Sequence, residues 1–356
     1  MRYTREQYYR IWLACVEGVG ARSADRLIEK YGSAEAVWTC FGEPMRWIGD
    51  KVWQALAKAR DRDWAHALFD RIDASDIRVV FREGAGYPPL LRTLGDAPPL
   101  LFVRGVADLS DPLTFAIVGA RNGSSYGKAM TEEIAEAIAG AGVTVVSGFA
   151  RGIDSAAHRG ALKAGGRTIA VLGCGVDVLY PPENGKLLDE LLESGGSLVS
   201  EYGPGMPPLS ENFPRRNRLI SGMSRGVLLA EAAPKSGAMI TVEYALEQGR
   251  EVFVLPGPAN ARLSEMPNRL AREGARVVTS AQELLEDLDV FGLPWANRRP
   301  KDLPPQLTAE EKLVYDALQD GEKGVDQLME RTGLSVQQVN SVLTMLGIQG
   351  IIEDTL

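Results

Sequence analysis

The stretch Ser147-Gly-Phe-Ala-Arg-Gly-Ile-Asp-Ser-Ala-Ala-His-Arg-Gly160 decides the fold, because it joins a buried strand to a helix. The apolar run Val143–Val146 before it predicts the strand, and the alanine-rich residues near its end predict the helix. A helix N-terminus favours negative charge, and Arg151 and His158 add side-chain donors there. The stretch therefore indicates a site for phosphate or another anion, although a tight turn that simply needs glycine gives the same pattern. Small residues let backbone N–H groups approach such a ligand: Ser147, Gly148 and Gly152.

Strands and helices alternate on both sides of this stretch. Buried strands are predicted at 115–118, 143–146, 168–172, 197–200, 226–231 and 251–255, and helices at 127–140, 186–193 and 239–248. Continuous apolar strands that alternate with helices predict an α/β fold with a doubly wound parallel sheet. Ligands of such sheets bind beyond the carboxyl ends of the strands, so the residues just after each strand are the candidates for a site.

These strand ends are rich in glycine and arginine. No Gly-x-Gly-x-x-Gly follows a strand and no Walker A lysine motif is present, so the usual sequence support for NAD, FAD or ATP is missing. We expect neither a cofactor nor a metal. The candidate residues are Gly119, Arg121, Ser147, Gly148, Arg151, Gly173, Gly175, Glu201, Glu231, Lys235, Ser236, Gly237, Pro256 and Gly257.

A second arginine-rich stretch, Asn212-Phe-Pro-Arg-Arg-Asn-Arg-Leu-Ile220, lies just before a predicted strand. In a helix Arg215 and Arg218 share one face, and Arg216 is turned aside. Arginines beside Phe213 supply what single-stranded nucleic acid needs, namely positive charge for phosphates and a flat ring for a base. A surface helix held by salt bridges is the alternative, and the position at the ligand end of the sheet favours a binding site.

Composition restricts the class of protein. With 356 residues, 45% hydrophobic and 24% charged, the chain fits a soluble globular protein of two or three domains. No apolar run approaches the ~20 residues of a membrane span, and we expect no signal peptide. Three cysteines lie far apart, which fits a reducing cytoplasm. The net charge of −8 means that any nucleic-acid surface must be a local patch.

Residues 1–75 are predicted to form a small helical domain. The turn Gly18-Val-Gly20 between apolar residues at helical spacing has the pattern of a helix-hairpin-helix, whose backbone N–H groups hold a DNA phosphate. An ordinary corner between two helices gives the same pattern. Residues 76–112 are predicted to add two short strands at the edge of the main sheet, at 77–81 and 98–103, within a domain that ends at 291. Four tryptophans are expected in the helical core: Trp38, Trp47, Trp53 and Trp64.

The sequence resembles the DNA-processing protein A family (DprA, also called Smf) through several motifs in the same order. No single motif would suffice, and together they span residues 87–278. They are Ile117–Arg121 with Tyr126 and Gly127; Ser147–His158; Ile169–Asp177 with Tyr180, Pro181 and Asn184; Phe213–Arg218; Ser236 and Gly237 with Thr241; and Gly249–Gly257.

The resemblance implies an extended Rossmann-like fold that binds single-stranded DNA and is not an enzyme. Members of the family protect incoming single strands during natural transformation, help to load the RecA recombinase onto them, and usually act as homodimers. Backbone N–H groups and arginines hold phosphates, so affinity is expected to fall steeply with salt. Carried over to this sequence, the DNA pocket consists of Gly119, Arg121, Ser147, Gly148, Arg151, Gly152, Phe213, Arg215, Asn217 and Arg218, and the strand ends add Lys235.

Two positions depart from the family pattern. Family members commonly carry Ser-x-Gly-x-Asn after the Pro-Gly turn, and this chain has Met266 at the glycine position, which puts the local turn in doubt. Ala120 stands where serine is frequent, so one hydroxyl contact is expected to be missing.

An enzyme is the alternative function. The predicted topology also resembles the phosphoribohydrolases that cleave nucleoside monophosphates, whose motif is Pro-Gly-Gly-x-Gly-Thr-x-x-Glu. The equivalent stretch Ser236–Glu243 lacks the paired glycines and places the acid one position early. Acid–base chemistry would need pairs of titratable groups, for which Asp154 with His158 and Glu231 with Glu243 are the candidates.

The C-terminal segment is predicted to be a linker at 292–307 and a winged-helix-like domain at 308–356, which many family members carry. Helices are expected from 308, at 325–332 and at 335–346, with a short strand at 348–353. The domain holds nine acidic and three basic residues, a net charge of −6, and the second helix of its helix–turn–helix has no Lys or Arg. Because a major-groove reader needs phosphate contacts, we expect a protein-interaction or regulatory module instead.

Overall fold

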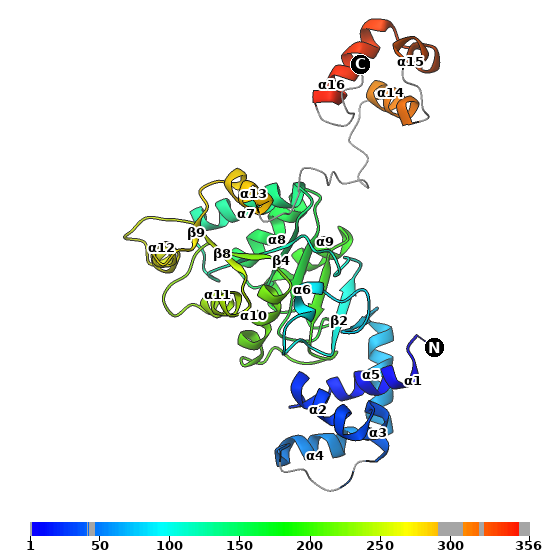
Figure 1. The fold of residues 1–356 in the computed structure, drawn as a ribbon, viewed down its shortest axis with the longest axis vertical. Helices are drawn as coiled ribbons and strands as arrows, with labels where there is room; N and C mark the ends of the chain where they lie inside the picture. Colours follow the sequence, from blue (N-terminus) through cyan, green and yellow to red (C-terminus); the bar gives the residue numbers. More distant parts are fainter. Residues whose placement is uncertain (1, 41, 43–46, 291–308, 320–323, 349–356) are drawn as a thin grey trace. The chain divides into compact units, whose positions relative to one another are not determined.

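The computed structural model describes residues 2–40, 42, 47–290, 309–319 and 324–348. Residues 1–297 form one compact unit and residues 298–356 a second. The boundary predicted at residue 75 therefore lies inside the first unit, between the N-terminal helices and the first strand of the sheet (Figure 1). The predicted linker at 292–307 lies outside the described residues.

A mixed, mostly parallel sheet forms the centre of the first unit. Within the described residues it has nine strands in the order β1-β2-β6-β5-β4-β3-β7-β8-β9. Parallel strands run outward from β3 in both directions, which confirms the predicted doubly wound α/β fold, and β1 and β2 extend it by antiparallel pairing. The strands are β1 (Arg78–Phe81), β2 (Leu100–Gly105), β3 (Thr114–Val118), β4 (Thr144–Ser147), β5 (Thr168–Val171), β6 (Ser197–Ser200), β7 (Gly226–Leu229), β8 (Glu251–Val254) and β9 (Arg276–Val277).

Helices cover both faces of the sheet because successive side chains of a strand point to opposite sides. In β3, Phe115 and Ile117 enter a core with α7, α8 and α13, whereas Ala116 and Val118 enter a core with α10, α11 and α12. The helices beside the sheet are α6 (Pro89–Arg92), α7 (Ser125–Gly140), α8 (Ile153–Lys163), α9 (Gly185–Glu193), α10 (Asn212–Gly222), α11 (Ala238–Glu247), α12 (Glu265–Arg272) and α13 (Ala281–Val290).

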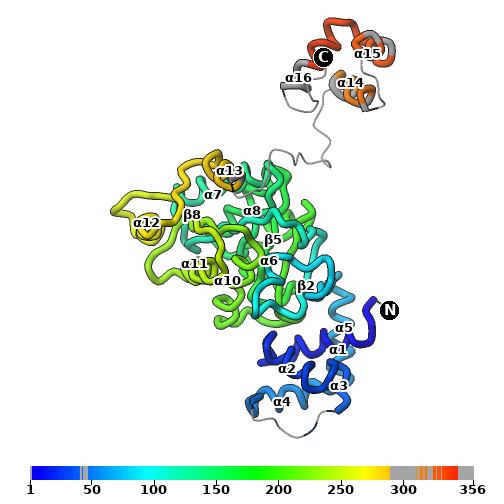
Figure 2. Tube along the Cα trace, viewed as in Figure 1, coloured from blue at the N-terminus to red at the C-terminus, as the bar shows by residue number. Residues whose placement is uncertain are grey.

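Helices α1 to α5 precede the sheet in the described part of the chain, and Figure 2 colours them in shades of blue. Trp12 is buried at their centre, and the tryptophans predicted for this core pack around it as partly buried side chains. Gly18, in the predicted glycine turn, has φ +79° and lies against Val52, so its packing alone explains a glycine there. The helices are α1 (Arg5–Ala14), α2 (Ala21–Tyr31), α3 (Ala34–Thr39), α4 (Asp50–Ala59) and α5 (Arg62–Ala74).

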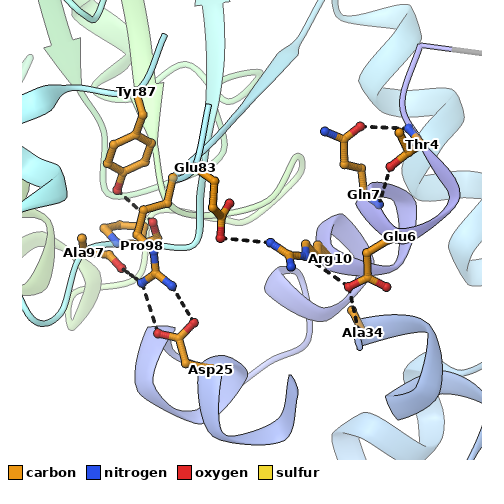
Figure 3. Close-up of polar contacts among 11 residues, drawn as sticks. Thr4, Glu6, Gln7, Arg10, Asp25, Ala34, Glu83, Tyr87, Ala97 and Pro98 are labelled. Atoms are coloured by element: carbon orange, nitrogen blue, oxygen red, sulfur yellow. Dashed lines mark hydrogen bonds and ion pairs between the residues drawn. The ribbon is translucent and has the colours of Figure 1, made fainter. Parts of the chain in front are cut away.

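The N-terminal helices are fixed to the edge of the sheet by both apolar and polar contacts. Ile11 of α1 and Ile72 of α5 share one core with Phe102 of β2. Arg10 of α1 reaches Glu83, as Figure 3 shows, with the two side-chain atoms 3.0 Å apart. Asp25 of α2 accepts from the Arg82 guanidinium at 2.8 Å. The helical segment therefore packs against the edge of the sheet through both kinds of contact.

The second unit contains α14 (Ala309–Gln319), α15 (Val325–Thr332) and α16 (Val336–Ile348). Gly333 ends α15 with φ +71°, which confirms the predicted helix, turn and helix. A small core joins the three helices through Val314, Leu328 and Val339. Apart from Ile348, which ends α16, the strand predicted at 348–353 lies outside the described residues.

Candidate nucleic-acid interface

A pocket opens at the carboxyl ends of β3, β4 and β5, where the sequence analysis expected a ligand. The loops after these three strands form its walls, and the first turns of α10 close it. This is the edge at which ligands of doubly wound sheets bind. The lining residues are Arg121, Gly148, Phe149, Ala150, Arg151, Leu172, Gly173, Cys174, Tyr180, Pro181, Phe213 and Arg216.

The turn between β4 and α8 has an unusual backbone conformation. Phe149 adopts φ +59°, in the left-handed region that side chains other than glycine rarely occupy, and its ring is buried in the core. The Asn184 side-chain amide donates to the Phe149 carbonyl at 2.9 Å, and the Ser155 hydroxyl donates to the Ala150 carbonyl at 2.7 Å. The ring therefore points inward, and the backbone on either side of it faces the pocket.

The first turn of α8 carries its own negative charge. Asp154 is buried, and its Oδ2 accepts from the Ala150 N–H at 3.2 Å. Burial raises the pKa of this carboxyl, although the neighbouring Arg216 acts in the opposite direction. The positive end of α8 is thus partly neutralised by the chain itself, and a bound anion depends on the arginines around the pocket.

Arg216 forms the floor of the pocket and was missed by the sequence analysis. It is turned away from exposed Arg215, as expected, but it was not predicted to enter the pocket; it lies on the face of α10 that carries buried Leu219 and Ile220. Its guanidinium donates to the carbonyls of Gly148, at 2.7 Å, and Val171. Burial lowers the pKa of Arg216 to about 10. Arg216 precedes Leu219 and Ile220 by three and four residues, and this spacing along one helix face was the sequence signal that it points to the core.

Two aromatic rings form one side of the pocket. Phe213 and Tyr180 pack with their ring centroids 5.3 Å apart, and the Tyr180 residue is 37% exposed. The guanidinium of Arg121 lies 5.7 Å from the centroid of the Phe213 ring. A flat surface beside an exposed cation matches the requirements of an unpaired base and its phosphate.

Two of the four predicted exposed cations lie in the wall of the pocket. Arg121, Arg215 and Lys235 are exposed, and Arg151 is 57% exposed beside Glu183 at 3.5 Å. Arg121 and Arg151 line the pocket itself, whereas Arg215 and Lys235 do not. An exposed ion pair of this length contributes little, so Arg151 can exchange Glu183 for a phosphate.

Three of the predicted small residues shape the site without lining the pocket. The Ser147 hydroxyl is buried and donates to the Ile117 carbonyl at 2.6 Å. A Cβ on Gly119 would meet Ile153 at 2.7 Å, and one on Gly152 would meet the carbonyls of Ala120 and Arg121 at 2.4 Å. These positions need small side chains for close packing of α8 on β3.

Asn217 and Arg218 hold α10 in place. The Asn217 amide donates to the Gly237 carbonyl at 3.1 Å. Arg218 has a side chain that is 12% exposed and lies 2.6 Å from Glu201 and 3.4 Å from Asp96. Although Arg215 and Arg218 share a helix, the structure therefore leaves Arg215 exposed and pairs Arg218 with acids.

The groups considered for acid–base chemistry do not converge on the pocket. His158 is buried, and its Nδ1 lies 2.7 Å from the Thr168 hydroxyl. Because that hydroxyl donates to the Val145 carbonyl, Nδ1 carries the proton, and burial lowers the pKa of His158 to about 3. Glu231 accepts from the backbone and hydroxyl of Ser124, and Glu243 is exposed on α11.

The turn that departs from the family pattern is intact. Asn268 accepts from the Gly257 N–H at 3.2 Å and donates to the Gly257 carbonyl at 2.9 Å. Met266 is buried in the core beside α11 and leaves this contact undisturbed. Ala120 is buried and makes backbone bonds to Glu231 and Ile153.

The fold and the pocket define a class: an extended Rossmann-like α/β protein with an arginine-rich, aromatic pocket and no metal-binding cluster among its described residues. The family model described as DNA recombination-mediator protein A matches residues 78–289, and the model described as DprA winged helix domain matches residues 298–355. The chain belongs to the DNA recombination-mediator protein A family, as the motifs indicated.

Relatives and solved structures agree with this assignment. Protein Smf of Escherichia coli is 44% identical over 276 residues, which cover 74% of this chain and 72% of that protein. The crystal structure of DNA processing protein A from Streptococcus pneumoniae is 34% identical, with a TM-score of 0.63 over 81% of this chain and 99% of that chain. The structure of DNA processing protein A from Helicobacter pylori, described for its single-stranded DNA binding mode, is 31% identical, with a TM-score of 0.55 over 60% of this chain and 96% of that chain. Within the described residues no helix is long and apolar enough to cross a membrane.

Proposed function

We propose that the pocket at the ends of β3, β4 and β5 binds single-stranded DNA. The observation that carries the proposal is the grouping of exposed arginines around an aromatic pair in a chain with a net charge of −8. Arg121 and Arg151 would hold phosphates, and Phe213 with Tyr180 would offer a ring surface to a base. The Helicobacter pylori relative, whose structure describes single-stranded DNA binding, supports the same ligand.

Binding, and not catalysis, is the activity that the geometry supports. The Asp154 carboxylate is buried at the β4–α8 turn, His158 is buried and neutral, and Glu231 is engaged by Ser124. A nucleotide hydrolase of the phosphoribohydrolase type would need at least one of these groups free beside the pocket. The enzyme alternative is therefore the weaker of the two.

The biological role proposed for the chain follows from its family. We propose that it acts in the cytoplasm as a homodimer that protects incoming single-stranded DNA during natural transformation and helps to load the RecA recombinase. Streptococcus pneumoniae DNA processing protein DprA is 45% identical to this chain over 203 residues. The acidic C-terminal unit is proposed to contact protein, because the exposed face of α16 offers no basic side chain for phosphate.

The test is a binding titration with fluorescent oligo-dT and with a duplex of the same length at several salt concentrations. We expect preference for the single strand and a linear fall of log K with log salt, at a slope of about −0.7 for each phosphate contact. Arg121→Ala and Arg151→Ala should each reduce that slope by one contact.

Arg272→Ala, at an exposed arginine of α12 that does not line the pocket, serves as the matched control. It should leave both the affinity and the slope unchanged. If Arg121→Ala and Arg151→Ala also bind as the wild type does, the pocket is not the DNA site. Release of free base from AMP or CMP would restore the enzyme alternative.

A further inference from the structure

Three segments that are far apart in the sequence meet at one carboxylate behind the pocket. Asp177 lies in the loop after β5, and its Oδ1 accepts from the Gly205 N–H, in the loop after β6, at 2.9 Å. Its Oδ2 accepts from the Nε of Arg71 at the end of α5. The Asp177 side chain is 7% exposed and that of Arg71 is 51% exposed. The carboxylate thus connects the N-terminal helices with two loops of the sheet.

The loop that Asp177 holds is a wall of the pocket. Leu172, Gly173, Cys174, Tyr180 and Pro181 all belong to this loop and line the pocket on either side of Asp177. The loop has a further tie in the bond from the Gly175 N–H to the Met206 carbonyl at 3.0 Å. Its shape therefore depends on contacts with neighbouring segments.

Close packing shows that the three segments are fitted to one another. A Cβ on Gly175 would lie 2.6 Å from Asp177 Oδ1 and 2.9 Å from the Gly205 nitrogen. Gly205 has φ +79°, and a Cβ there would meet Arg71 Nη1 at 2.8 Å. Larger side chains at these glycines would push Arg71 and Asp177 apart. The space around the Arg71–Asp177 ion pair therefore has no room for side chains at Gly175 and Gly205.

We propose that Asp177 and Arg71 are positioning residues for the DNA pocket, through which the N-terminal helical segment sets single-strand affinity without touching the strand. The pair fixes the loop after β5, and the loop places Tyr180 against Phe213, where a base would pack. The proposal rests on the proposed function of the pocket. When the pair is broken, the loop must be ordered at the moment of binding, and affinity is lost to that cost.

The experiment measures oligo-dT affinity, its salt dependence and melting temperature for the full chain and for Arg71→Gln, Arg71→Lys and Asp177→Asn. We expect Arg71→Gln and Asp177→Asn to weaken binding about tenfold, the lower end of what a lost charge-assisted hydrogen bond costs, because Arg71 is half exposed to solvent. The salt slope should not change, since neither side chain touches a phosphate. Arg71→Lys keeps the charge and should restore affinity to within about twofold of the wild type.

A second ion pair of α5 supplies the matched control. Asp73 of α5 pairs with Arg2 at 3.7 Å, and Arg2→Gln removes this exposed ion pair without reaching the pocket loops. It should leave oligo-dT affinity unchanged. Loop opening is read separately from the rate at which a thiol reagent labels Cys174, whose thiol is buried, in a chain that also carries Cys15→Ala and Cys40→Ser. Arg71→Gln should raise that rate and Arg2→Gln should not.

Each contrary result has a distinct meaning. Wild-type affinity in both Arg71→Gln and Asp177→Asn overturns the proposal, as does an equal loss in Arg2→Gln, which would reflect general stability. A smaller salt slope in Arg71→Gln would mean that Arg71 contacts DNA directly, and this too overturns it. If Asp177→Asn does not fold, the oligo-dT affinity of Arg71→Gln, a change at a half-exposed residue, decides the question alone. A wild-type chain that fails to bind oligo-dT would refute the proposed function itself.

Discussion

Arg216→Met removes the buried cation beneath the pocket and keeps a side chain of similar length. In the wild type the guanidinium donates to the carbonyls of Gly148 and Val171 and offsets the charge of Asp154. Both charged groups are buried, Arg216 at 5% exposure and Asp154 at 6%. The variant leaves the Asp154 carboxylate without its neighbouring cation and leaves two buried carbonyls without that donor.

The expected loss is large for a single substitution. Each buried carbonyl that loses its donor costs about 1–3 kcal/mol, and the buried Asp154 carboxylate also loses a nearby cation, against a total unfolding free energy of about 5–15 kcal/mol. The same change should raise the pKa of Asp154 further, because Arg216 is the main influence that lowers it. An acid whose folded pKa exceeds its unfolded value of 3.8 loses stability as pH rises between the two values. The variant should therefore be less destabilised near pH 4 than near pH 7.5.

Urea unfolding at both pH values checks this reasoning. The double variant Arg216→Met with Asp154→Asn should recover more than half of the loss at neutral pH, since it removes the uncompensated charge. A loss below about 1 kcal/mol for Arg216→Met, at either pH, would refute the claim that buried Arg216 supports the floor of the pocket. So would a double variant that is no more stable than the single one.

Other expectations follow from contacts near the pocket. Gly148→Ala should destabilise the chain by about 1–3 kcal/mol and reduce oligo-dT affinity, because the new Cβ would lie 2.7 Å from Asp154 Oδ2. Gly237→Ala is the control, because a Cβ there would have no atom within 4 Å, and it should change neither stability nor affinity in matched urea and binding titrations. Asn268→Ala should cost about 1–2 kcal/mol in thermal unfolding through loss of both bonds to the Pro-Gly turn. His158, with a pKa lowered to about 3, should make the wild type lose up to about 1.4 kcal/mol per pH unit as pH falls below 6.5, and His158→Phe should flatten that dependence in urea titrations.

Local sequence patterns predicted the architecture well because strands and helices leave periodic signals. The buried runs at 115–118 and 168–172 correspond to β3 and β5, and the edge strands at 77–81 and 98–103 to β1 and β2. The position of the pocket also followed, since parallel strands place their carboxyl ends at one edge. The docking of α1 and α5 on the sheet did not follow, because the contacts of Ile11 and Ile72 with Phe102 join segments without any shared local pattern.

Side-chain roles were harder to predict than positions. Sequence spacing alone grouped Arg215 with Arg218, but Arg218 meets Glu201, a residue of the loop after β6, and this pairing depends on tertiary structure. Arg216 was misjudged because charged residues are seldom buried, although its spacing to Leu219 and Ile220 pointed to the core face. The role of Asp177 required the positions of α5 and of the loop after β6, which sequence spacing does not provide.

Photocrosslinking tests the central claim most directly. An oligo-dT that carries 5-iodouracil would be bound to the full chain, irradiated, and the adduct located by mass spectrometry. A base packed against the aromatic pair should give adducts at Tyr180 or Phe213, and their yield should fall in Arg121→Ala at concentrations that just saturate the wild type. Adducts confined to the N-terminal helices or to residues 309–348 would contradict the account.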